Sequence, residues 1–134
     1  MNEYKFEEEE TWKLARELAW DVYSVTSRGA FESDFLMRNS VRRASFAIMA
    51  NVAEGVEKGG TVEFIRYLSR AKDEIEELQQ QLEKAQECGF INSTTLARLE
   101  MMMRSLGCMI SALMTSINQE FISVETVGLN YQGS

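Results

Sequence analysis

The stretch VRRASFAIMANVAEGVEKGGTVEFIRYLSR, residues 41–70, carries the strongest structural signal in the chain. An arginine pair, Arg42 and Arg43, is followed by the string Asn51-Val52-Ala53-Glu54-Gly55. A glycine break at 59–60 separates this string from Glu63-Phe64-Ile65-Arg66. Apolar residues surround the polar ones at helical spacing, so we expect two helices joined by a turn at 57–60.

The second half of the chain contains the clearest helical periodicity. The apolar residues of 61–88 step by four and three without a break, which predicts a heptad seam: Phe64, Leu68, Ala71, Ile75, Leu78, Leu82 and Ala85. Residues 93–122 repeat the pattern with Leu96, Leu99, Met103, Leu106, Ile110, Leu113 and Ile117. Gly107 interrupts this second helix, and we expect a close helix crossing there. Asn92 and Ser93 are candidate N-caps.

Two further helices are predicted upstream, over 8–27 and 34–56. Proline is absent and glycines lie mostly at the predicted borders, which favours long helices with short corners at 28–33, 57–60 and 89–92. We therefore expect an all-α, antiparallel up-down-up-down four-helix bundle over 1–122. The last residues, 123–134, lack periodicity and are predicted to be a flexible tail.

The composition excludes several classes of chemistry. The chain has no histidine, which removes histidine-dependent nucleophilic catalysis, general bases and metal ligands. Gly59-Gly60-Thr61 lacks the residues of a phosphate loop and is predicted to be a turn and N-cap. The acidic runs Glu7–Glu10 and Asp73–Glu77 are expected to be solvated helix faces. We expect neither enzymatic activity nor a cofactor or metal.

The cysteine and hydropathy patterns favour a cytoplasmic protein. Cys88 and Cys108 fall in different predicted helices, and buried free thiols are expected, although the sequence leaves a disulfide open. No apolar run is long enough for a membrane span. The acidic start does not resemble a secretory signal.

The net charge of −7 disfavours broad nucleic-acid binding. Only residues 33–56 are net positive, with three basic and two acidic groups. Arg38, Arg42 and Arg43 in this segment are the candidate nucleic-acid contacts.

The polar residues of 41–70 have a structural and a functional interpretation. Asn51 and Glu54 lie three residues apart on one helix and could form a small polar site. They could equally hydrogen-bond the following turn or pair with an arginine, because buried polar groups need partners. We favour a structural motif that pairs Arg42 or Arg43 with a carboxylate such as Glu54 or Glu63 on a neighbouring helix or subunit. Gly55 and Arg66 complete it.

Several motifs together resemble the 23S rRNA intervening-sequence proteins. The string Asn51–Gly55 resembles the family's second helix, and Leu14–Ala19 with Val22-Tyr23 resembles its first. Glu63–Leu68, Glu77-Leu78 and Gln81-Leu82 resemble the third helix, and Gly89–Ile91 the third corner. The family's usual prolines are replaced near Ala30 and Met49.

This resemblance implies a four-helix bundle that assembles into a homopentamer, in a family whose biochemical role is unknown. Our first hypothesis is therefore a non-enzymatic homo-oligomer. The accessory protein of diversity-generating retroelements shares the bundle and binds nucleic acid, so the alternative is a nucleic-acid-associated accessory ring. The sequence leaves open which apolar face forms the subunit interface.

Overall fold

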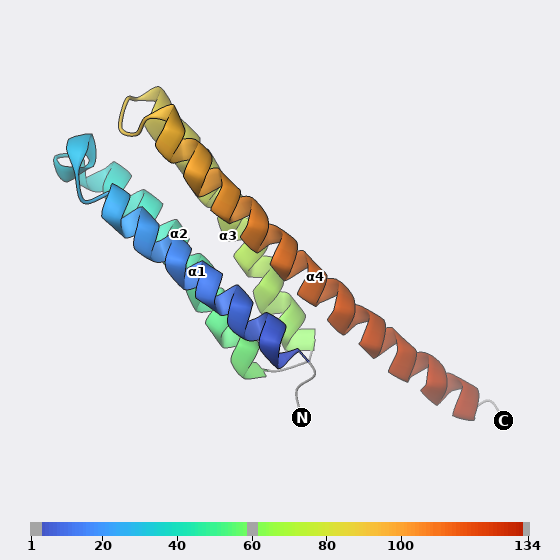
Figure 1. The fold of residues 1–134 in the computed structure, drawn as a ribbon. Coiled ribbons are helices and arrows are strands. Elements are labelled where there is room, and N and C mark those ends of the chain that lie inside the picture. Colours follow the sequence, from blue (N-terminus) through green and yellow to red (C-terminus); the bar gives the residue numbers. More distant parts are fainter. Residues whose placement is uncertain (1–3, 59–61, 133–134) are drawn as a thin grey trace.

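The described residues form four long helices, as predicted. The computed structural model describes residues 4–58 and 62–132, with side chains described as far as Glu120. The elements are α1 (Lys5–Val25), the 3₁₀ helix η1 (Gly29–Glu32), α2 (Phe35–Lys58), α3 (Val62–Glu87) and α4 (Ser93–Gln132). No strand occurs among the described residues, so the all-α prediction is confirmed. Figure 1 shows that successive helices run in opposite directions.

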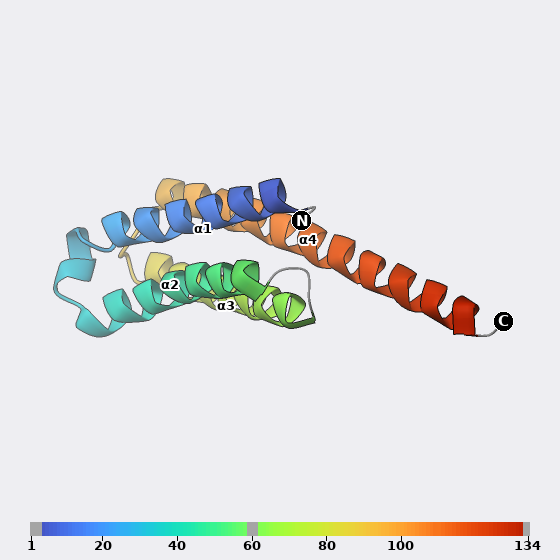
Figure 2. The same ribbon diagram turned by 90° about the horizontal axis from the view of Figure 1, so that it is seen from below.

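The helices follow one another around the bundle. Each helix packs against its neighbours in the chain, and α4 closes the bundle against α1. The α2–α3 pair makes the most extensive contact. In Figure 2, α1 and α2 lie side by side and are joined through η1.

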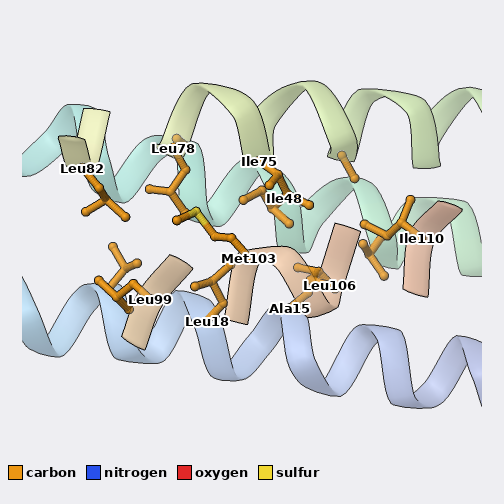
Figure 3. Packing of buried hydrophobic residues seen from close by; sticks show 14 of the residues in the cluster. Ala15, Leu18, Ile48, Ile75, Leu78, Leu82, Leu99, Met103, Leu106 and Ile110 are labelled. Atoms are coloured by element: carbon orange, nitrogen blue, oxygen red, sulfur yellow. The ribbon is translucent and has the colours of Figure 1, made fainter. Parts of the chain in front are cut away.

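Apolar seams from all four helices meet in the core. Every member of the predicted α3 seam is buried. Met103 of α4 reaches between Leu78 and Leu18 at the centre of Figure 3. Since burial of one such side chain stabilises by about 1.5–3 kcal/mol, these seams supply most of the driving force for folding. In the predicted α4 seam, only Leu96 remains half-buried.

Two aromatic residues close the end of the bundle at the first and third corners. Phe31 of η1 is fully buried, and its ring centroid lies 5.1 Å from that of Phe90. Gly89 adopts φ +82°, which ends α3 with hydrogen bonds from Phe90 N to Ala85 O (2.8 Å) and from Gly89 N to Gln86 O (3.0 Å). This left-handed glycine cap turns the chain so that Phe90 faces Phe31.

The starts of α2 and α4 are capped by short polar side chains. The amide of Thr95 donates to Asn92 Oδ1 at 2.7 Å, so Asn92 caps α4 as predicted. The amide of Met37 donates to Asp34 Oδ1 at 2.9 Å at the start of α2. The predicted turn glycines Gly59 and Gly60 and the predicted cap Thr61 lie outside the described residues.

Two expectations for α4 were wrong. The helix continues to Gln132 where the sequence predicts a tail from 123, and its C-terminal end extends beyond the other helices (Figures 1 and 2). Without proline, helix propagation adds one hydrogen bond per residue and needs no periodic pattern. No close crossing occurs at Gly107, because a Cβ built there meets no described heavy atom within 4 Å.

Candidate functional site

Arg42 joins α2 to the C-terminal end of α1. Its Nε donates to Thr26 Oγ1 at 2.8 Å and its Nη2 donates to Ser27 Oγ at 2.9 Å. Its guanidinium lies 4.0 Å from the centroid of the Tyr23 ring. Within one chain, the predicted pairing of Arg42 with Glu54 or Glu63 is therefore wrong, and a pairing with a neighbouring subunit stays a prediction. The partners of Arg42 lie across the first corner, because α1 and α2 run antiparallel and bring residue 42 beside residues 23–27.

The other two candidate arginines differ in their surroundings. Arg38 is half-buried, donates from Nη1 to the carbonyl of Glu32 at 3.2 Å, and lies over the ring of Phe35 at 5.8 Å. Arg43 is exposed. The three arginines thus do not converge on one point. Two of them instead stack on aromatic rings.

Asn51 and Glu54 do not form a shared polar site. Asn51 Nδ2 donates to the carbonyl of Ala47 at 2.8 Å, one turn earlier in α2. One N–H of its amide is therefore paired within its own helix, and the expected hydrogen bond to the following turn falls on residues 59–61, which lie outside the described residues. Glu54 is exposed, as are Glu63 and Arg66 on α3.

Gly55 provides the closest approach between α2 and α3. A Cβ at this position would lie 3.3 Å from Phe64 Cδ1 and 3.3 Å from Tyr67 Cβ. These contacts are tight, so glycine lets the two backbones approach each other. The string Asn51–Gly55 therefore belongs to the packing of the α2–α3 hairpin.

The outer surface of α1 and α2 carries a set of aromatic side chains that lie outside the predicted polar motif. Trp20 stacks on Tyr23 with ring centroids 6.3 Å apart, and Trp20 is 76% exposed. Phe46 lies one turn after Arg42 in α2 and is 43% exposed. The spacing of Trp20, Tyr23 and Phe46 from the buried residues of their helices already indicated that these side chains lie near the surface. Their position beside Arg42 depends on how α1 pairs with α2.

An open hollow of about 520 Å³ continues this surface toward the start of α1. Trp12 and Arg16 of α1 face Ala53 and Val56 of α2 across it, and the Arg16 guanidinium lies 4.8 Å from the centroid of a Trp12 ring. Glu8, also at its border, is buried, so the expectation that the whole acidic run is solvated was wrong for this residue. The hollow has a mixed apolar and charged lining.

Other site chemistries find little support in the described side chains. Within residues 4–58 and 62–120, no group of three or more cysteine or acidic residues is placed to hold a metal ion. Cys88 and Cys108 are free and exposed, and the expected burial of both thiols was wrong. None of the described helices is long and apolar enough to cross a membrane.

The fold and the site define a helical-bundle protein. Its candidate site residues, such as Arg42 and Asn51, serve mainly in helix packing. The family model of the 23S rRNA-intervening sequence protein matches residues 7–112, and the chain belongs to this family. The match covers α1 from residue 7, all of α2 and α3, and half of α4. None of the curated proteins compared with the chain shows a significant match.

Proposed function

We propose that the protein is a non-enzymatic interaction protein that works as a homo-oligomer, with a pentamer as the expected assembly. The observation that carries the proposal is the number of large apolar side chains left exposed by the single chain. They include Trp20, Phe35, Leu36 and Met101, each more than half exposed. Large exposed apolar areas are typical of protein–protein contact surfaces.

Two further observations support the proposal of a non-enzymatic homo-oligomer. The C-terminal end of α4 extends beyond the other helices, and a helix without tertiary packing is marginally stable in water. The polar residues that resemble a site are occupied by contacts within the protomer, as for Arg42 and Asn51.

The proposal includes a cytoplasmic location, which the free thiols of Cys88 and Cys108 support, since oxidising compartments favour disulfides.

Light scattering coupled to size exclusion tests this proposal. Five copies of the 15.3 kDa chain would give a mass of about 77 kDa. A single species at this mass, retained on dilution to micromolar concentration, is the expected result. A mass of one chain at the same concentration would refute the homo-oligomer.

The second candidate function is that of a nucleic-acid-associated accessory protein. The observation in its favour is the stacking of Arg38 on Phe35 and of Arg42 on Tyr23, because aromatic and arginine side chains provide stacking surfaces for bases. Binding to single-stranded RNA and DNA, measured at increasing salt, tests it. Absence of salt-sensitive binding at low ionic strength would reject this candidate.

A further inference from the structure

Four exposed aromatic residues of α1 and α2 lie on the side where these two helices pair. We call it the α1–α2 aromatic face and define it by six residues: Arg16, Trp20 and Tyr23 of α1, and Phe35, Arg42 and Phe46 of α2. The contacts of Arg42 with Tyr23, and of Tyr23 with Trp20, connect the two helices. Phe35 and Arg42 are seven residues apart and share one side of α2.

Phe46 lies in the middle of this face. It follows Arg42 by one turn and precedes Ala53 by two. Arg42 contacts Tyr23 of α1, and Ala53 faces Trp12 and Arg16 across the hollow between the helices. Phe46 is therefore placed on the side of α2 that borders α1, level with the α1 segment between Arg16 and Tyr23.

The composition of the face matches the centre of a protein interface. Trp, Tyr, Phe and Arg are enriched in such interfaces and dominate their binding energy. Trp20 is 76% exposed, Phe35 63%, Tyr23 45% and Phe46 43%. Stacking between Trp20 and Tyr23, and between Tyr23 and Arg42, already orders these side chains in the protomer. Less conformational entropy is then lost on association.

Charge indicates which partner fits. Helix α2 has four basic and two acidic residues and is the only net positive helix of the four. By contrast, α1 has three basic and six acidic residues, and α3 has four basic and seven acidic residues. A second copy of the chain therefore offers acidic helical surface to the positive helix of the first. Such a contact joins two different patches and can close a ring.

A polyanion fits the face less well. Carboxylates of Glu9 and Glu57 line the adjoining hollow, and Glu17 lies beside Arg16 and Trp20. A phosphate backbone is negative along its whole length and would be repelled where it passes these carboxylates. Helix α3 of a second copy carries four basic residues among its acidic ones and can place them against the same carboxylates.

We propose that the α1–α2 aromatic face is the surface through which one copy of the chain binds the next. This inference rests on the proposed homo-oligomer and specifies its interface. Trp20 is expected to become buried against the neighbouring copy. Phe46 and Arg42 are expected to lie within the same contact.

The two tryptophans allow a direct test. The chain contains only Trp12 and Trp20, so Trp12→Phe leaves Trp20 as the single reporter, and Trp20→Phe is the matched control that reports on Trp12. Iodide quenching is measured on samples whose mass is determined in parallel by light scattering. We expect Trp20 in the oligomer to be quenched several-fold less than in protein diluted to monomer.

The outcomes separate the two proposals. A monomeric wild type would refute the homo-oligomer itself. An oligomer in which Trp20 is quenched as strongly as in the monomer would leave the homo-oligomer intact and overturn the assignment of this face. Protection of Trp20 only after addition of single-stranded RNA would also overturn it, in favour of a nucleic-acid surface.

A second pair of variants tests how much Trp20 contributes to the free energy of association. Trp20→Glu is expected to weaken association by at least about 30-fold, as expected for a central aromatic contact. Phe6→Glu, at a comparably exposed aromatic residue of α1 that lies outside this face beside Met109, controls for the effect of an added surface charge. Helical circular dichroism and thermal unfolding establish that both variants fold. Unchanged association of a folded Trp20→Glu variant would overturn the inference.

Discussion

The guanidinium of Arg42 lies 4.0 Å from the centroid of the Tyr23 ring, and this contact links the second helix to the end of the first. The same side chain donates to Thr26, whose hydroxyl in turn donates to the carbonyl of Val22 at 2.7 Å. Thr26 is fully buried. Arg42 therefore satisfies a hydroxyl oxygen in the core and stabilises the first corner of the bundle.

Arg42→Ala is expected to destabilise the protein by about 1–3 kcal/mol, through the lost hydrogen bonds and the lost cation–π contact. Arg42→Lys should recover only part of this, because an ammonium cannot reproduce two directed guanidinium donors. Urea unfolding measures both changes. Arg43→Ala removes a neighbouring exposed charge and should stay within about 0.5 kcal/mol of wild type. Equal effects of Arg42→Ala and Arg43→Ala would contradict the role given to Arg42.

Two glycine substitutions should have opposite signs. Gly107→Ala adds a methyl group into open space within α4 and should stabilise by up to about 1 kcal/mol through helix propensity. Gly55→Ala gains the same propensity but places its Cβ 3.3 Å from the Cβ of Tyr67, which moves only with the α3 backbone. We expect net destabilisation by about 1–2 kcal/mol, since overpacking typically costs 1–3 kcal/mol. Thermal unfolding of both variants is the measurement, and stabilisation by Gly55→Ala would refute the close α2–α3 approach.

Phe31→Ala should be among the most destabilising substitutions outside the four long helices. Phe31 is fully buried against Phe90, so its truncation leaves a cavity and is expected to cost about 3–5 kcal/mol. Phe31→Leu retains most of the volume and provides the control, with a smaller expected loss. Calorimetric or denaturant unfolding distinguishes them. A cost below that of Phe31→Leu would show that η1 does not close the core.

Removal of the Asn92 side chain tests whether it caps the start of α4. Asn92→Ala deletes the acceptor of the Thr95 amide and should destabilise by about 1 kcal/mol. Asn92→Asp keeps an acceptor and should be nearly neutral. Ser93→Ala, at the neighbouring exposed position, is the matched control for solvent-facing polarity. Comparable losses for the substitutions at 92 and 93 would contradict the capping geometry.

The sequence by itself determined the four helices, the cap at Asn92 and almost all of the core. Helical periodicity reports which side of a helix is apolar, and a heptad seam such as that from Phe64 to Ala85 must be buried wherever its partners lie. The motifs of the first three helices also carried the family resemblance. These signals are local, because each depends on residues that lie within one or two helical turns of each other in the sequence.

Only the tertiary structure decided which polar and aromatic residues meet. Arg42 contacts Tyr23 and Thr26 because α1 and α2 pair at one particular register. The spacing of residues within either helix does not predict that register. The burial of Phe31 depends on Phe90, which lies at a different corner, and the α1–α2 aromatic face exists because two separate helices place their exposed rings side by side. Periodicity fixes one helix face at a time, whereas a surface shared by two helices is set by their packing against each other.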